Sequence, residues 1–284
     1  MSVNVKLKFY GGVGLYTGIR EINPSEEELA EFYEGKVNYE VLPNQYLAIK
    51  QGEKYVDKYK KDKDGKLKQL NKFKAMESSL MGKIKPKNFK QELFFDLLET
   101  DIPLVTVGGQ SGSGKTFLTT CYALQELEKR KYDKIVFIRN NVSIANVPEL
   151  GILPGDEIQK LRGYFAYVAD ILNPFMFDNY LQQQKVEVAW LGSMRGRSIS
   201  NSFCICSESQ NLTTELVKMT ISRMGEGSRL VFDYDLDQID RKVFEKDSGI
   251  MTMINSLQGN PSFGMVTLDL VERSELAKLA SLIK

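Results

Sequence analysis

The 284-residue sequence contains no histidine. This absence excludes catalysis by an imidazole base and every zinc site that needs a histidine ligand. Cysteine is also scarce, because Cys121, Cys204 and Cys206 are the only three. An odd and small number argues against a disulfide framework, so we expect reduced, buried thiols. The alternative for Cys204-x-Cys206 is half of a metal site, but a second cysteine pair is missing.

Long apolar runs are absent too. Stretches such as residues 102–107 fall far short of the ~20 apolar residues that cross a bilayer. The first residues alternate in polarity and show no basic stretch followed by an apolar core, which argues against export. With 42% hydrophobic residues the chain can bury a real core. We therefore expect a soluble cytoplasmic protein, with no membrane partner.

The chain as a whole has almost equal numbers of basic and acidic residues, and its formal net charge is +1. No overall field therefore indicates a nucleic-acid partner. Residues 50–90 are the exception, with 14 lysines, no arginine and 5 acidic residues. This stretch is either a solvated linker or a phosphate-binding surface, for which Tyr55, Tyr59 and Phe73 offer rings for base stacking.

The sequence pattern changes near residue 85. Before it, we expect a small α+β segment, with a strand over residues 3–10, a helix capped by Ser25 with Glu28, and short strands over residues 39–50. After it, short apolar runs alternate with helical stretches, which predicts an α/β fold with a mainly parallel sheet covered on both faces. The expected strands are 104–107, 134–138, 186–191, 203–206, 230–234 and 265–268; the expected helices are 117–130, 156–172, 213–224 and 274–284. We place the domain boundary between residues 84 and 85.

One motif carries specific chemistry. The segment 109–116, Gly-Gln-Ser-Gly-Ser-Gly-Lys-Thr, matches the Walker A pattern between an expected strand and an expected helix. Glycines let the backbone amides surround a phosphate, and the helix N-terminus adds partial positive charge. Lys115 is expected to bridge the β- and γ-phosphates, and the Thr116 hydroxyl to ligate Mg²⁺.

Acidic residues follow two later strands. Glu208 lies at the end of an apolar strand, where ligands bind in open α/β sheets, and is therefore placed to orient and deprotonate an attacking water. The run Asp233-Tyr-Asp235 and the following Gln238 end the next strand. A solvated acidic loop is the alternative for this second site.

At these residues the chain resembles the PhoH-like ATPase family, P-loop proteins related to superfamily-one helicases. The resemblance runs from about residue 41 to residue 284. The matching segments are 85–91, 109–116, Arg139, 150–156 with Lys160, 195–197, 208–211, 222–228, 235–240 and 272–277. They look most like the branch in which a PIN nuclease domain precedes the ATPase. About 40 residues precede the match here, too few for such a domain.

The resemblance implies a RecA-like core, ATP and Mg²⁺ as cofactors, a homo-oligomeric ring such as a hexamer, and RNA or single-stranded nucleic acid as partner. It implies that Gln91 reads the adenine edge, that Gln238 senses the γ-phosphate, and that Arg223 and Arg273 stabilise transition-state charge. One of these arginines would act across a subunit boundary. The nucleotide would lie on Gly109, Gln110, Ser111, Gly112, Ser113, Gly114, Lys115, Thr116 and Phe117, and the metal near Thr116, Glu208, Ser207 and Asp235.

Two departures from the family pattern matter. Ser207 stands where the family has an aspartate before Glu208, and Tyr234 stands where it has a glycine. The missing aspartate normally holds the Mg²⁺ shell, a role that Asp233 or Asp235 would have to fill. Tyr234 would narrow the nucleotide crevice.

Three functions follow from this pattern. The first is an Mg²⁺-dependent ATPase that couples hydrolysis to RNA binding or remodelling. The second is a nucleotide-gated binding module in which Ser207 has weakened hydrolysis. The third, a small-molecule kinase, lacks the arginine-rich lid that such enzymes use, since Arg195 and Arg197 are the only close pair.

Overall fold

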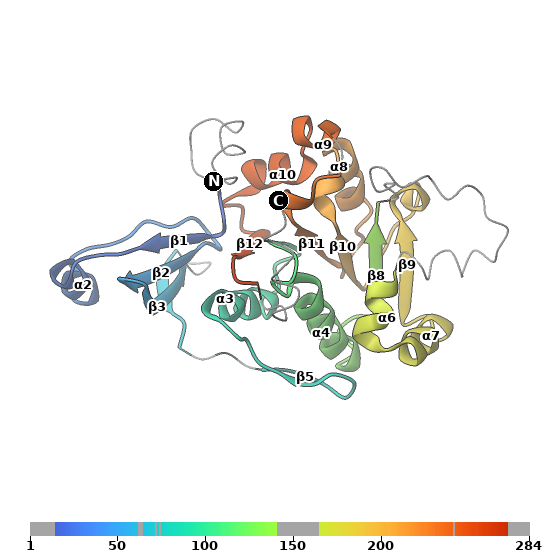
Figure 1. The fold of residues 1–284 in the computed structure, drawn as a ribbon, viewed down its shortest axis with the longest axis horizontal. Coiled ribbons are helices and arrows are strands. Elements are labelled where there is room, and N and C mark those ends of the chain that lie inside the picture. The colour runs from blue at the N-terminus through green and yellow to red at the C-terminus, as the bar shows by residue number, and fades with distance from the viewer. Residues whose placement is uncertain are drawn as a thin grey trace, which may run out of the picture.

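The computed structural model describes residues 15–61, 65–71, 73, 75–140, 165–240 and 242–271. These residues form a six-stranded sheet with helices on both faces, a separate four-stranded sheet and a two-stranded hairpin (Figure 1). The strand expected at 3–10 and the helix expected at 274–284 lie outside the described residues, as does most of the helix expected at 156–172. No helix in the described part is long and apolar enough to cross a membrane.

The six-stranded sheet is entirely parallel, in the order β12-β7-β11-β10-β8-β9. Its strands coincide with the six predicted apolar runs to within about two residues. They are β7 (Leu104–Gly109), β8 (Lys134–Arg139), β9 (Val186–Trp190), β10 (Ser202–Ser207), β11 (Arg229–Tyr234) and β12 (Phe263–Leu268). The predicted α/β fold with a parallel sheet is therefore confirmed, and its strand order places β11 between the strands that end in the P-loop and at Ser207.

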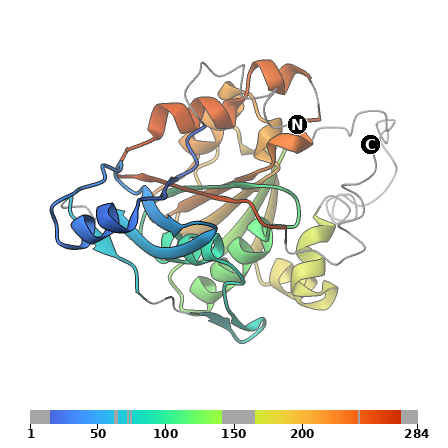
Figure 2. The same cartoon turned by 60° about the vertical axis from the view of Figure 1, so that its left-hand side comes forward.

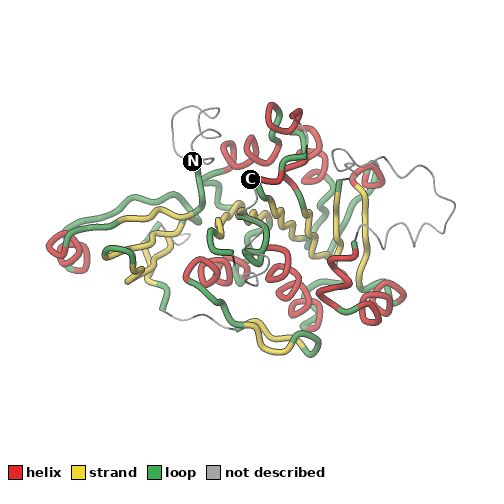
Figure 3. Tube along the Cα trace, in the orientation of Figure 1, coloured by secondary structure: helices red, strands yellow, loops and turns green. Residues whose placement is uncertain are grey.

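Helices cover both faces of this sheet, as a parallel sheet requires (Figures 1 and 2). One face carries α3 (Phe89–Leu98), α4 (Lys115–Glu128), α6 (Ala166–Leu172) and α7 (Pro174–Gln182). The opposite face carries α8 (Thr214–Ser222) and α10 (Gly249–Leu257), with the short α9 (Lys242–Lys246) before α10. In Figure 3 the helices lie on both sides of the strands.

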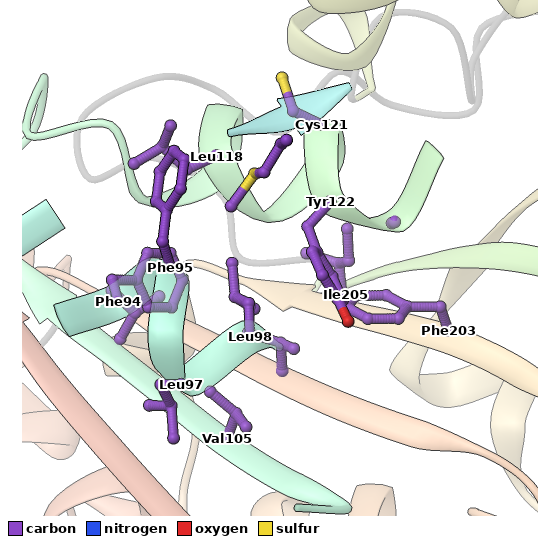
Figure 4. Packing of buried hydrophobic residues seen from close by; sticks show 14 of the residues in the cluster. Phe94, Phe95, Leu97, Leu98, Val105, Leu118, Cys121, Tyr122, Phe203 and Ile205 are labelled. Carbon is purple, nitrogen blue, oxygen red and sulfur yellow. The ribbon is translucent and has the colours of Figure 1, made fainter. Parts of the chain in front are cut away.

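The core beneath α3 and α4 is built from alternate residues of the strands. Figure 4 shows Phe203 and Ile205 of β10 packed there with residues of α3, α4 and β7. Cys204 and Cys206 point to the other face, because successive side chains on a strand alternate. These two thiols and Cys121 are buried and free, so the prediction of reduced core cysteines is confirmed.

The N-terminal part forms its own small sheet. Its elements are β1 (Ile19–Ile22), α2 (Glu26–Tyr33), β2 (Tyr46–Gln51), β3 (Lys54–Lys61) and β4 (Leu67–Gln69), followed by the hairpin of β5 (Met76–Ser78) and β6 (Gly82–Ile84). The predicted capping box is present, with Ser25 and Glu28 bonding each other's backbone. Of the strands expected over residues 39–50, one forms, because regular pairing with β1 starts at Tyr46, after the turn at Pro43.

This small sheet is fixed to α3 by part of the lysine-rich stretch. Lys60 Nζ lies 3.1 Å from Asp96, and Lys58 pairs with Glu92. Residues 54–61 are therefore a paired strand, and the prediction that they form a linker is wrong. The two lysines satisfy acids of the same chain, which removes them from any phosphate-binding surface.

Candidate nucleotide-binding site

The P-loop lies between the end of β7 at Gly109 and the start of α4 at Lys115. Gly109, Gly112 and Gly114 have φ angles of 142°, 86° and 96°, which other residues adopt only with strain. A Cβ on Gly109 would also lie 2.1 Å from the carbonyl oxygen of Leu268. The glycine spacing of the motif is thus required by the backbone that is present.

The start of α4 has the properties of an anion-binding site. α2, α3, α7, α8 and α10 each begin with a side chain that caps a backbone N–H, whereas α4 begins at Gly114 with no such cap and no acid in its first turn. The Oγ of Ser113 is buried and has no hydrogen-bond partner. Uncapped N–H groups and the helix dipole both favour a bound phosphate.

Lys115 points back over this loop. Its side chain is 8% exposed, and its Nζ donates to the carbonyl oxygens of Gly109 at 2.7 Å and of Gln110 at 3.0 Å. Its ammonium group makes no ion pair with a carboxylate of the described residues. A buried cation held by neutral carbonyl groups is suited to an anionic ligand in the loop.

Asp233, on β11, is a buried acid that contacts α4, the helix that follows the P-loop. Its Oδ2 accepts a hydrogen bond from Thr116 Oγ1 at 2.7 Å and another from Ser207 Oγ at 3.1 Å. Its Oδ1 accepts the backbone N–H of Glu208 at 3.1 Å. Burial raises the pKa of Asp233, and the Lys115 charge with these hydrogen bonds lowers it only in part.

The end of β10 faces this acid. Ser207 is buried, and its Oγ also accepts a hydrogen bond from the hydroxyl of Tyr167 at 3.3 Å. Glu208 follows with a left-handed backbone, φ 58°, which turns its side chain away from the strand direction. Its Oε2 accepts from Gln210 Nε2 at 2.6 Å, and the residue is half-buried. Ser207 thus faces α4 beside Asp233, and Glu208 stands at the carboxyl edge of the sheet.

Amide side chains join the two acidic segments. Gln210 accepts the backbone N–H of Asp235 at 3.1 Å and donates to the carbonyl of Gln238 at 3.1 Å. Asn211 exchanges two hydrogen bonds with Asp240, one of 2.6 Å and one of 2.9 Å. The segments 208–211 and 235–240 are therefore one cross-braced unit at the sheet edge.

This unit touches the P-loop directly. Asp235 is 6% exposed, and its carboxylate accepts N–H groups of Ser111 at 2.7 Å and Asp237 at 3.0 Å. Burial raises its pKa. The side chain of Gln238, three residues after Asp235, is exposed at the same edge. The structure thus brings Lys115, Thr116, Ser207, Glu208 and Asp235 together around one loop.

Gln91 and Phe117 approach the loop from the α3 side and from α4 itself. Gln91 is buried, donates from Nε2 to the carbonyl of Ser113 at 3.1 Å and accepts the N–H of Lys87 at 2.9 Å. Phe117, in the first turn of α4, is 38% exposed. Both predicted nucleotide contacts therefore lie beside the P-loop.

The sequence comparisons agree with this geometry. The family model described as PhoH-like protein matches residues 83–283. The chain belongs to this family. It is 34% identical over 204 residues to Protein PhoH2 of Mycolicibacterium smegmatis, and the alignment covers 70% of this chain and 46% of that protein. It is 32% identical over 289 residues to Protein PhoH2 of Bacillus subtilis, and that alignment covers 94% of this chain and 64% of the relative. The PhoH-like protein of Synechocystis is 31% identical over 183 residues, covering 62% and 55%. The chain thus spans about half to two thirds of the length of these relatives.

One of the two predicted catalytic arginines of this PhoH-like chain lies away from the P-loop. Arg223 ends α8 at the amino edge of the sheet, where its carbonyl accepts the N–H of Ile199 at 2.8 Å. A six-residue strand separates that edge from the P-loop by roughly 20 Å. Arg197 pairs with Glu187, and Arg195 is exposed. Arg273, the segment 150–156 and Lys160 lie outside the described residues.

Tyr234 does not narrow the nucleotide crevice, contrary to expectation. The side chain is 3% exposed and packs in the core on the α8 and α10 face, opposite to Asp233. Its ring fills the space where a Cβ on Gly108 would be, with its hydroxyl oxygen 2.5 Å from that position. The glycine that precedes the Walker A motif therefore makes room for the tyrosine.

The residues present fit Mg²⁺ bound together with phosphate. No group of three or more acidic, histidine or cysteine side chains in the described part of the chain would hold a metal alone. Mg²⁺ in nucleotide sites takes phosphate oxygens and waters plus only one or two protein groups. The Thr116 hydroxyl and the nearby carboxylate of Asp233 match that requirement.

The contact of Tyr167 with Ser207 was not anticipated from the sequence. Tyr167 reaches Ser207 from α6, and no local pattern predicts that contact. The sequence pattern predicts Asp233 only as one of two substitutes for the missing acid. Asp233 and Val231 are two residues apart on one strand, so their side chains point to the same face of the sheet. Because Val231 belongs to the core beneath α4, strand alternation alone predicts that Asp233 faces α4.

Proposed function

We propose that this PhoH-like protein binds ATP with Mg²⁺ and hydrolyses it, and that hydrolysis is coupled to RNA binding or remodelling. One observation supports the proposal above all others. An uncapped helix N-terminus with a buried, unpaired lysine faces two strand ends that carry Asp233 and Glu208. This arrangement provides phosphate binding on one side and carboxylates for metal and water on the other.

Each residue has a distinct task in this reaction. The P-loop amides and Lys115 hold the phosphates, and the Thr116 hydroxyl holds the metal. Mg²⁺, when bound, neutralises charge that develops on the phosphate oxygens. Glu208 orients and deprotonates the attacking water, and Gln238 detects the γ-phosphate from its exposed position at the same edge. The Gln210 amide, 2.6 Å from Glu208, fixes the direction of that carboxylate.

A second candidate is a nucleotide-gated binding module with little hydrolysis. The observation in its favour is Ser207, which leaves the end of β10 without the carboxylate that the family pattern has there. In that case ATP would order the P-loop and the cross-braced segments 208–211 and 235–240 without being turned over.

Phosphate release and ATP binding, each measured with and without single-stranded RNA, distinguish the two. Turnover that RNA stimulates supports the ATPase; binding without turnover supports the module. Lys115→Ala is the control for contaminating activity, and Lys218→Ala, on the exposed side of α8, is its matched surface variant. Equal turnover by Lys115→Ala and wild type would refute the site.

We propose that RNA contacts lysines of the lysine-rich stretch, residues 50–90, that have no acidic partner among the described residues. Lys83, Lys85 and Lys87 are exposed and precede α3 directly. Reversing all three to glutamate should weaken RNA binding. It should also reduce the slope of log affinity against log salt concentration by about 2, because each lost phosphate contact with a single strand accounts for about 0.7. Reversing Lys58, which pairs with Glu92, should instead lower thermal stability. An unchanged salt slope in the triple variant would exclude this surface.

A further inference from the structure

Asp233 stands one strand nearer to the P-loop than Ser207 does. β11 is hydrogen-bonded to β7, with Asp233 opposite Val107, whereas β10 is one strand further away. The register places the carboxylate beside the first turn of α4, where it contacts Thr116. An acid at this position reaches the metal-binding threonine without help from β10.

We infer that Asp233 positions the metal in this protein, and that the acid usually placed before Glu208 has been replaced by one on the neighbouring strand. The inference rests on the proposed function and names a positioning residue for it. The carboxylate fixes Thr116 Oγ1 by accepting a hydrogen bond from it at 2.7 Å, which leaves the hydroxyl lone pairs free for the metal. Carboxylates that hold a metal ligand in this way commonly determine metal affinity.

The hydrogen bonds of Asp233 leave room for this role. An ionised carboxylate has about four acceptor positions. Three are filled, by Thr116 and Ser207 on Oδ2 and by the N–H of Glu208 on Oδ1. One position on Oδ1 remains, which is available to a water of the metal shell.

Ser207 supports this acid and is not a failed ligand. Its hydroxyl donates to Asp233 at 3.1 Å and accepts from Tyr167 at 3.3 Å. Aspartate at residue 207 would put two buried carboxylates in contact, which is unfavourable unless one takes up a proton. Asp235, the other substitute, accepts the N–H groups of Ser111 and Asp237, whereas the Thr116 hydroxyl donates to Asp233.

The test measures the dissociation constant of a non-hydrolysable ATP analogue by calorimetry, with Mg²⁺ and with EDTA. The ratio of the two constants gives the contribution of the metal without any turnover. Asp233→Asn should lower that ratio roughly 10- to 100-fold, the usual effect of losing a partner of a metal ligand. Its affinity in EDTA should be unchanged or higher, because a negative charge near the phosphates is lost.

Two further variants complete the design. Asp235→Asn should keep the wild-type ratio. The double variant Ser207→Asp with Asp233→Ser keeps one acid among the same partners and should restore the ratio to within about threefold. It also tests the inference if Asp233→Asn does not fold. A wild-type ratio in Asp233→Asn, a loss in Asp235→Asn, or no recovery in the folded double variant would overturn the inference. Wild type that does not bind the analogue would overturn the proposed function itself.

Discussion

Gln91 Nε2 donates a hydrogen bond to the carbonyl oxygen of Ser113, 22 residues along the chain, at 3.1 Å. Gln91 Oε1 accepts the N–H of Lys87 at 2.9 Å, so the start of α3 is tied to the P-loop through this one side chain. A glutamine amide has two N–H groups and two lone pairs. One of each remains, and together they match the N6 and N7 edge of adenine.

Gln91→Ala should therefore weaken ATP binding by about 1–3 kcal/mol and remove any preference over GTP, because a bidentate base contact is lost. Competition binding of ATP and GTP to wild type and variant measures both effects. Glu99→Gln, at the exposed C-cap of the same helix, is the matched control. An equal loss for ATP and GTP would show that Gln91 only supports the P-loop.

Glu208→Gln should leave ATP binding intact and lower hydrolysis by about a hundredfold or more, because the amide keeps the size of the side chain but not its basicity. The amide oxygen can still accept the hydrogen bond from Gln210. Equilibrium binding and single-turnover hydrolysis are measured side by side, with Glu215→Gln on the exposed face of α8 as control. Parallel loss of binding and hydrolysis would indicate that Glu208 holds the metal instead.

Much of this site follows from local sequence, because a P-loop is a local structure. Its glycines, its lysine and the strand before it are contiguous in the chain. The contact of Thr116 with Asp233 spans 117 residues and depends on which strand lies next to β7. Strand order is set by packing across the whole sheet, so the sequence left Asp233 and Asp235 as equal alternatives.

The same limit explains the errors on Tyr234 and on the lysine-rich stretch. Tyr234 ends a strand beside acidic residues, but side chains alternate along a strand, so Tyr234 faces the core. Its ring packs there because Gly108 has no side chain to occupy that space. The lysines of β3 have a clear local excess of charge, yet their partners Glu92 and Asp96 lie on α3, beyond the stretch itself. Composition within a window does not reveal partners outside it.

The contact between β1 and the P-loop domain should be sensitive to acid. Burial raises the pKa of Glu21, but hydrogen bonds from Lys50, Lys90 and Tyr55 outweigh it and lower the pKa to about 2. A lowered folded pKa stabilises the fold above the unfolded value of 4.5 and loses that effect as the pH falls toward 2. Because the carboxylate is partly exposed, we expect a contribution of about 1 kcal/mol.

Urea unfolding of wild type and Glu21→Gln between pH 7 and pH 2 measures this contribution. The difference between them should be largest near neutral pH and shrink below pH 4.5. Glu34→Gln, whose carboxylate pairs with the exposed Lys36, should behave like wild type throughout. A difference between wild type and Glu21→Gln that does not change with pH would mean that the ion pairs with Lys50 and Lys90 contribute nothing.

Arg223 allows a direct test of whether this protein works as an oligomeric ring. It lies at the sheet edge opposite to the P-loop of its own chain, so it could contact a nucleotide only if that nucleotide were bound to a neighbouring subunit. If it supplies transition-state charge there, Arg223→Ala and Lys115→Ala should each lose most activity, by about 10³-fold for a trans-acting arginine.

Mixing the two inactive proteins then decides the question. A mixed oligomer contains sites with an intact Lys115 from one subunit and an intact Arg223 from the next, so phosphate release should recover to a substantial fraction of wild type. Light scattering on the same mixture reports whether oligomers form, and Arg195→Ala, at an exposed arginine, serves as the control that should not lose activity. Oligomers that form without recovery would show that Arg223 does not act across a subunit boundary. An Arg223→Ala protein that remains fully active would show that Arg223 has no part in hydrolysis.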